Sequence, residues 1–284
     1  MKTVNSLSGG KTSSYIAANY PADYNVFALV RTDDKNCIYP DKKVRQIVSD
    51  KIGKEFIGTL EDDVIIDTML DLEQFIGQQI HWVSGNTFDE VLNSSNNNLL
   101  PSALRRYCTT EMKMQPIFEW WLKNINQPAL FNIGFRANEM SRAKKIKEKY
   151  NINGFLEFKH IIGKHKNGRN KWKTTQWQRQ QHPLIKDGIF KDKMEEYWKD
   201  KPVRFAWMNN CVGCFHKQPH LLNKMATKHP KKLEWFASKE RDRKQKWDKF
   251  RVDGLTYDKI INYNFQIDLF DDDFNECDSG YCGL

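Results

Sequence analysis

The sequence predicts an α/β fold in which a largely parallel sheet carries helices on both faces. Short apolar runs alternate with amphipathic segments through the first half of the chain, the pattern of βαβ units. A glycine-containing turn follows the first run and opens a helix. With 39% hydrophobic and 13% aromatic residues among 284, the chain can bury a core, which argues against global disorder.

The elements of the first half are predicted from spacing and from turn signals. Apolar residues at helical intervals, such as Val44, Ile47 and Val48, predict helices, whereas short β-rich runs predict strands. The expected strands are residues 3–7, 25–31, 56–57, 80–83 and 129–133. The expected helices are residues 12–19, 41–53, 62–78 and 113–123.

The second half differs in composition, and it includes a strongly basic stretch. Residues 159–186 hold eight Lys or Arg and no Asp or Glu, with Trp172 and Trp177 among them. The turn signal Asn167-Gly168 predicts a basic hairpin there. Helical patterns return at 191–199, 218–226 and 231–249. We therefore expect an α/β domain over 1–200, with a basic insert at about 159–181, and a helical, Cys-rich C-terminal lobe over 201–284.

The turn after the first strand has the residues that an anion needs. In the sequence SGGKTS, two glycines let backbone N–H groups approach oxygen atoms, and the helix start adds unpaired donors and a positive dipole end. Lys11 supplies a charge, and Ser8, Thr12 and Ser13 supply hydroxyls. The spacing excludes a Walker A loop. The alternative is an ordinary Ser/Gly turn capped at a helix start.

Four ordered segments give the chain its resemblance to a family. SGGKTS resembles the PP-loop of N-type ATP pyrophosphatases. Residues 106–116 (RYCTTEMKMQP), 134–142 (GFRANEMSR) and 182–185 (HPLI) resemble elements of proteins similar to phosphoadenosine phosphosulfate (PAPS) reductase. The resemblance spans nearly the whole chain. It implies an adenine-nucleotide alpha hydrolase-like, Rossmann-like fold that binds ATP or PAPS at the edge of the sheet.

The resemblance also implies roles for individual residues. Arg136 and Arg142 would neutralise phosphate or sulfate charge, and Lys113 would contribute likewise, so that Lys113 and Arg136 are the expected catalytic cations. The nucleotide phosphates would be bound by Ser8, Gly9, Gly10, Lys11, Thr12 and Ser13. The alternative for Arg136, Glu139 and Arg142 is an ion-pair set on a solvated helix face.

Asp33 follows the second strand, where a carboxylate would hold Mg²⁺ or a ribose. An Asp-Asp pair at 33–34 is equally typical of a loop or of a helix cap.

The clustered cysteines indicate a metal centre. Cys211 and Cys214 form a C-x-x-C on a turn, Cys108 lies in the family-like C-T element, and Cys277 or Cys282 would complete four thiolates. Such a set suits Zn²⁺ or a [4Fe–4S] cluster, and the resemblance favours the cluster. The alternatives are a redox-active pair and unliganded cysteines. Cys37 stands apart and is interpreted as a small structural or surface residue.

The end of the chain, Cys282-Gly283-Leu284, resembles the tail whose cysteine is the nucleophile of sulfonucleotide reductases. Tyr281 stands where that tail has glutamate, and no histidine follows. In that reaction Cys282 would attack the sulfate sulfur, and a thiol donor would later release the product. If Cys277 completes the metal site, Cys282 remains free for this role. If Cys282 is a metal ligand, the reductase interpretation weakens sharply.

Charge and hydropathy limit the partners. The net charge of +9 favours polyanions, and the basic residues of 159–186 with two tryptophans would suit tRNA or DNA. A solvated loop or a gate over the nucleotide is the alternative. No apolar run approaches a membrane span and no signal peptide is recognised, so we expect a cytoplasmic protein without a membrane partner.

Three functions follow from these expectations. The favoured one is ATP pyrophosphatase or adenylation chemistry that supports sulfur transfer to a nucleic acid or small molecule, with a thiol or sulfur-donor protein as a further partner. The second is PAPS reduction with Cys282 as nucleophile. The third is a non-catalytic nucleic-acid-binding protein with a structural zinc.

Overall fold

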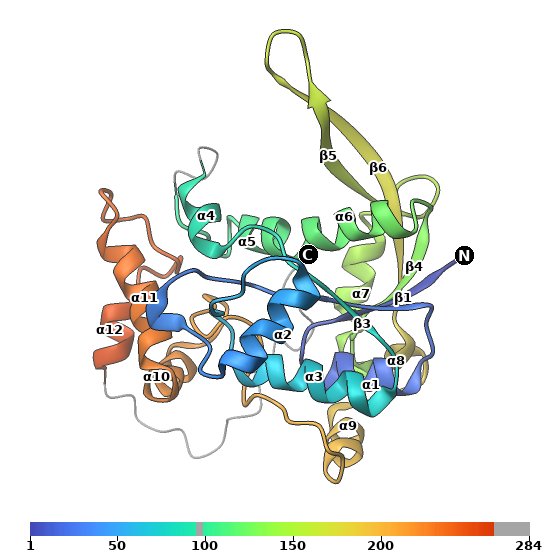
Figure 1. The fold of residues 1–284 in the computed structure, drawn as a ribbon, viewed down its shortest axis with the longest axis horizontal. Coiled ribbons are helices and arrows are strands. Elements are labelled where there is room, and N and C mark those ends of the chain that lie inside the picture. The colour runs from blue at the N-terminus through green and yellow to red at the C-terminus, as the bar shows by residue number, and fades with distance from the viewer. Residues whose placement is uncertain (95–98, 264–284) are drawn as a thin grey trace.

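A computed structural model describes residues 1–94 and 99–263. Its centre is a six-stranded sheet with the order β3-β2-β1-β4-β6-β5, parallel except for the antiparallel pair β5 and β6 (Figure 1). The strands are β1 (Thr3–Leu7), β2 (Tyr24–Ala28), β3 (Ile80–Val83), β4 (Ala129–Asn132), β5 (Leu156–Lys164) and β6 (Asn170–Gln181). The predicted α/β class with a largely parallel sheet is confirmed.

Helices connect the strands and form the C-terminal part. The first six are α1 (Lys11–Asn19), α2 (Lys42–Ile52), α3 (Val64–Ile76), α4 (Phe88–Asn93), α5 (Tyr107–Thr109) and α6 (Gln115–Asn124). The others are α7 (Met140–Lys147), α8 (Pro183–Lys186), α9 (Lys191–Trp198), α10 (Pro219–Lys228), α11 (Pro230–Arg241) and α12 (Tyr257–Asn262). Short 3₁₀ or π segments are η1 (Lys35–Cys37), η2 (Thr110–Met114) and η3 (Ala137–Glu139).

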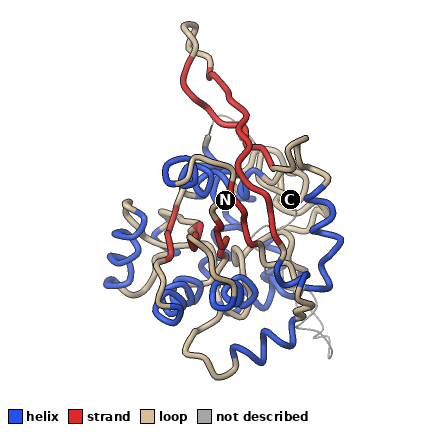
Figure 2. Tube along the Cα trace, turned by 90° about the vertical axis from the view of Figure 1, so that its right-hand side faces the viewer, coloured by secondary structure: helices blue, strands red, loops and turns tan. Residues whose placement is uncertain are grey.

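Both faces of the sheet are covered, because successive strand residues point to opposite sides. On one face Leu7 and Phe27 pack with Ile16 of α1 and Ile65 of α3. On the other face strand residues pack with α6 and α7, in a cluster that includes Val4, Val26, Phe131, Ile117, Phe118 and Ile146. Figure 2 shows the helices on either side of the strands. The strand order reverses between β1 and β4, which places the switch point of the sheet there.

A third apolar cluster joins the C-terminal helices to the region after β2 and β3. It contains Phe236 of α11, Tyr257 of α12 and Leu222 of α10, together with Phe88 and Val91 of α4. The C-terminal helices therefore share their core with α4 instead of enclosing one alone.

Local signals explain several boundaries. Asp41 accepts hydrogen bonds from the N–H groups of Lys43 and Val44 and begins α2, which ends at Gly53 in the left-handed conformation. A capping box of Thr87 and Glu90 begins α4.

Three sequence predictions need correction. Residues 56–57 are not a strand, because this segment makes only isolated bridges through Gly58. The helix expected over 231–249 ends at Arg241, where Asp242 follows as its C-cap. The basic hairpin exists, but β6 continues beyond it and pairs in parallel with β4. In the part of the chain that the structure describes, no helix combines the length and apolarity needed to cross a membrane.

Trp177 anchors β6, and its truncation is the first test of the fold. Trp177 is fully buried and packs against Phe131 and Phe118, whereas Trp172 on the same strand is 52% exposed. We expect Trp177→Ala to lower the free energy of unfolding by about 3–5 kcal/mol, measured by urea denaturation. The matched Trp172→Ala change should stay within about 0.5 kcal/mol. Equal losses in the two variants would contradict the placement of β6.

Candidate functional site

The turn between β1 and α1 is held by its own hydroxyl groups. Gly9 has φ +78°, and Gly10 is the extended N-cap of α1. The Ser8 N–H donates to Ser13 Oγ over 3.1 Å, and Ser13 Oγ donates to the Gly10 carbonyl over 3.1 Å. This leaves the turn in one shape at the start of a nine-residue helix, the arrangement that presents backbone N–H groups to an anion.

Two neighbouring elements approach this turn closely. A Cβ added to Gly9 would lie 2.5 Å from Cγ2 of Ile65, which is in the first turn of α3. A Cβ added to Gly134, just after β4, would lie 3.1 Å from Cγ2 of Thr12. The turn therefore lies between α3 and the end of β4, at the switch point of the sheet.

Helix α9 contacts the turn from a third side. The Lys11 ammonium pairs with Glu195, and Trp198 Nε1 donates to the Lys11 carbonyl over 3.0 Å. Tyr15 and Tyr197 pack edge to face nearby, with ring centroids 4.9 Å apart. The Lys11 ammonium would have to break its ion pair with Glu195 before it could bind a phosphate.

The segment after β4 carries the two predicted arginines. Arg136 and Arg142 both pair with Glu139, Arg136 over 3.3 Å, and Glu139 also accepts from the Arg136 N–H over 2.9 Å. The ion pairs of the alternative interpretation are thus present, but Arg136 is 9% exposed and lies at the carboxyl edge of the sheet. The set is therefore not on a fully solvated helix face.

An aromatic stack lies beside these arginines. The Arg142 guanidinium is 4.6 Å from the centroid of the Phe135 ring, and the His182 ring stacks on Phe135 with centroids 4.9 Å apart. Burial, with a smaller effect of Lys147, lowers the pKa of His182 to about 4. His182 is consequently neutral at pH 7.

The predicted Asp33 is exposed in the segment that follows β2. Its neighbour Asp34 accepts from the Asn36 N–H over 2.8 Å and caps η1, as the alternative interpretation expected for one of the pair. Cys37 is buried, and burial raises the pKa of its thiol to about 12, in keeping with a structural residue.

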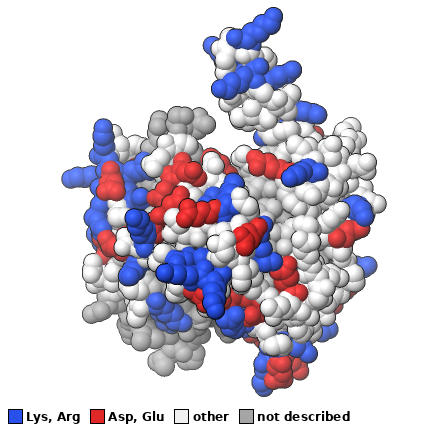
Figure 3. Space-filling view, viewed as in Figure 1, with Lys and Arg blue, Asp and Glu red and all other residues white. Residues whose placement is uncertain are grey.

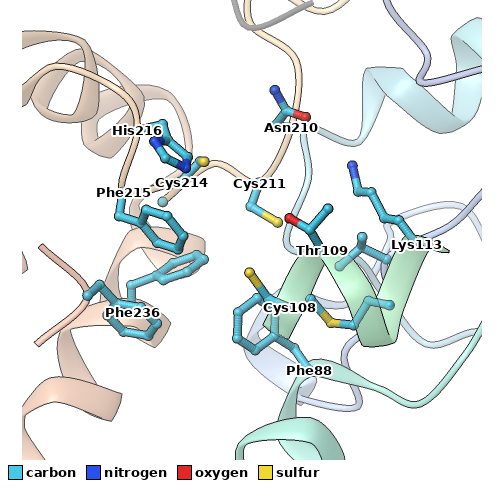
Figure 4. Close-up of a pocket in the computed structure, with 14 residues that line it drawn as sticks. Phe88, Cys108, Thr109, Lys113, Asn210, Cys211, Cys214, Phe215, His216 and Phe236 are labelled. Carbon is cyan, nitrogen blue, oxygen red and sulfur yellow. The ribbon is translucent and has the colours of Figure 1, made fainter. Parts of the chain in front are cut away.

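Three of the predicted metal ligands line one cavity. Cys108 of α5 faces Cys211 and Cys214 across a space of about 50 Å³, which Phe88 and Phe236 also line (Figure 4). Burial raises the pKa of Cys108 to about 11 and raises that of Cys211 above its ordinary range. Among the described residues, however, no three His, Cys, Asp or Glu side chains are placed to hold one metal ion. Cys277 and Cys282 lie outside the described residues.

Buried charges surround this cavity. Lys113 Nζ lies 2.8 Å from Glu61 Oε1. The Glu61 side chain is buried, and that of Lys113 is partly buried. Burial lowers the pKa of Lys113, but the charge and hydrogen bond of Glu61 together with the nearby Cys211 and Cys214 outweigh it, so that pKa is raised. Lys217 donates to the carbonyls of Asn209 and Cys211, and burial lowers its pKa. Lys113 thus lines the cysteine cavity itself, whereas Lys217 holds the backbone of the adjoining C-x-x-C turn.

Glu61 and Lys217 were not identified from the sequence. Their role depends on a segment preceding α3 that runs beside the C-x-x-C turn, where Glu61 and Cys211 form an antiparallel bridge. No local pattern marks a single Glu or Lys as buried. Lys113, in contrast, was found through its place in the 106–116 segment.

The structure divides the predicted residues into two groups. The turn residues, Gly134 and the Arg136–Arg142 set gather around the switch point, whereas Lys113 joins the three cysteines.

Comparisons with protein-family models, with curated proteins and with solved structures return no match for this chain.

The close approach of Ile65 makes Gly9 the sharpest test of the turn. Gly9 and Gly53 both have positive φ, so alanine costs about 1 kcal/mol of backbone strain at either position. Only the Cβ added at Gly9 would also clash with a neighbouring side chain, because nothing lies within 4 Å of a Cβ added at Gly53. We expect urea denaturation to show Gly9→Ala as about 1–3 kcal/mol more destabilising than Gly53→Ala. Equal costs would show that the turn is not packed on α3.

His182 gives a pH dependence whose sign follows from its lowered pKa. The unfolded chain binds a proton at this group below about pH 6.5, whereas the folded chain does so only near pH 4. Stability should therefore fall as the pH drops through this window. His182→Phe keeps the stack on Phe135 and should reduce that fall in denaturation curves, whereas replacing the exposed His165 should not. An unchanged pH profile for His182→Phe would refute the buried neutral ring.

Proposed function

We propose that the chain binds an adenine nucleotide at the switch point and uses ATP to adenylate a target, releasing pyrophosphate, in support of sulfur transfer. The observation that carries this proposal is the close packing of the 8–13 turn against Gly134, between the diverging strands β1 and β4. Parallel sheets bind ligands in the crevice at such a point, and a turn that opens a helix is suited to phosphate.

The finer fold that we propose is Rossmann-like, of the adenine-nucleotide alpha hydrolase type. Its support is the order β3-β2-β1-β4-β6 with parallel pairing and helices on both faces. The ordered motifs at 8–13, 106–116, 134–142 and 182–185 point the same way.

In the proposed reaction an oxygen of the target attacks the α-phosphorus, and the bond from this phosphorus to the bridging oxygen of pyrophosphate breaks. Backbone N–H groups of the turn and the Ser8, Thr12 and Ser13 hydroxyls would position the phosphates. Arg136 and Arg142 would then balance the developing charge, which is where positioned cations act most strongly. Asp33, exposed after β2, would hold Mg²⁺.

The cysteine cavity suits a thiolate-bound centre by its donor set. Three thiols from two segments face one space, and the cations Lys113 and Lys217 would complement the negative charge of thiolates. Cys108, Cys211 and Cys214 would hold the group, with Cys277 as the fourth ligand. A bound Zn²⁺ or [4Fe–4S] centre would link α5 to the C-x-x-C turn.

Removing two hydroxyls from the turn tests the proposed function. With Ser8→Ala/Thr12→Ala we expect ATP-dependent pyrophosphate release to fall by at least about tenfold, because hydrogen bonds to charged groups contribute about 1.5–3 kcal/mol each. Thr227→Ala on α10 is the matched control and should leave the rate unchanged.

Full activity in the turn variant would remove the turn from the site. The same assay, run with PAPS in place of ATP and with sulfite as the product measured, separates the reductase alternative that depends on Cys282.

A further inference from the structure

The basic hairpin projects from the body of the protein. Strand β6 pairs with β4 only over residues 178–181, and beyond that point its partner is β5 alone. Every residue from 161 to 174 is exposed, and this segment is called the basic arm (Figure 1). Such a two-stranded ribbon is marginally stable by itself, so its form depends on the buried Trp177 at its base.

The charge of the basic arm has one sign. Its fourteen residues include Lys164, Lys166, Arg169, Lys171 and Lys173 and no Asp or Glu. Figure 3 shows these basic side chains at the projecting end of the molecule, away from the acidic groups on the body. A ribbon that repels itself in this way suits a polyanionic partner.

The register sorts the side chains of the basic arm onto two faces. Ile161 lies opposite Trp172, and Lys164 lies opposite Asn170, so these four share one face. Lys171 and Lys173 point to the other face. Lys159 Nζ lies 5.3 Å from the Trp172 ring centroid, which puts a second cation beside the indole on its face.

Exposed apolar groups on this face lie outside the three apolar clusters of the protein. Trp172 is 52% exposed and Ile161 is 49% exposed, although neither contributes to any of the three apolar clusters. An indole flanked by Lys159 and Lys164 matches an unpaired base flanked by phosphates. The indole ring can stack on the base, and the ammonium groups can neutralise the phosphate charges. An acidic protein surface would match the charges but would give the indole no comparable partner.

We infer that the basic arm binds single-stranded nucleic acid, with a base stacked on Trp172 and phosphates at Lys159 and Lys164. Paired bases in a duplex show their edges and not their ring faces, so a strand with unstacked bases is the form that an exposed indole can bind. This inference rests on the proposed function for its biological meaning, because it names the class of acceptor.

Strand β6 connects the basic arm to the candidate site. Strand β6 runs from the arm to Gln181, and the next residue, His182, stacks on Phe135 beside Arg142. From residue 174 to 182 a strand spans roughly 26 Å at about 3.3 Å per residue. The arm therefore projects from the amino end of β6, and the candidate site lies at the carboxyl end of the same strand.

The experiment measures binding of fluorescein-labelled oligouridylate and oligothymidylate to the full-length protein by anisotropy, across a series of salt concentrations. We expect Trp172→Ala to weaken binding by about tenfold or more. Lys159→Gln/Lys164→Gln should weaken it and reduce the slope of log K against log salt by about 0.7 for each phosphate that the replaced lysines had neutralised. A duplex of the same length should bind more weakly than either single strand.

Matched controls lie on the C-terminal lobe. Trp247 is 63% exposed, and Lys244 and Lys246 are exposed, so Trp247→Ala and Lys244→Gln/Lys246→Gln should leave binding unchanged. Equal effects of arm and control variants, a preference for duplex, or no binding at low salt would overturn the inference. Binding of ATP by Trp172→Ala, measured separately, should match that of the unmodified protein. If the unmodified protein does not bind ATP, the proposed function is wrong, but the inference about the arm still stands.

Discussion

Close packing of the turn after β1, between α3 and the end of β4, constrains the rest of the site. Ile65 leaves no space for a side chain at Gly9, and Thr12 nearly fills the space at Gly134. Geometry therefore favours glycine at both positions, strongly at Gly9, where a Cβ would clash with Ile65, and less strongly at Gly134. Anything bound by the N–H groups of this turn therefore lies at the point where β1 and β4 diverge.

The segment before α3 joins this turn to the cysteine cavity. Glu61 pairs with Lys113, Asp62 lies 3.0 Å from His229, and the Leu60 carbonyl accepts from the Val212 N–H over 2.7 Å. Lys232, which is also buried, donates to the Glu61 carbonyl over 2.6 Å. Only a few residues later, Ile65 contacts Gly9. One short, well-bonded segment therefore contacts the C-x-x-C turn at one end and the turn after β1 at the other.

The sequence predicted the elements whose signals are local. β3 was predicted to the residue, and the hairpin was predicted from Asn167-Gly168, because turn chemistry and apolar runs act over few residues. The parallel pairing of β6 was missed because its inner half, Gln178 to Gln181, is polar although Gln178 and Gln180 are buried. The pair of Glu61 with Lys113 was missed because burial of a charge depends on segments 52 positions apart. The role of the C-terminal cysteines stays a prediction.

Strand β6 explains why the basic arm and the candidate site belong to one arrangement. Its outer half is exposed and basic, Trp177 enters the core between Phe131 and Phe118, and its inner half pairs with β4. A one-residue slip in the β4–β6 register would turn Trp177 out of the core and Trp172 to the other face of the arm, because strand side chains alternate. The burial of Trp177 therefore fixes both the face that the arm presents and the place of His182 beside Phe135. The same packing that stabilises the edge of the sheet therefore sets the distance between the basic arm and the candidate site.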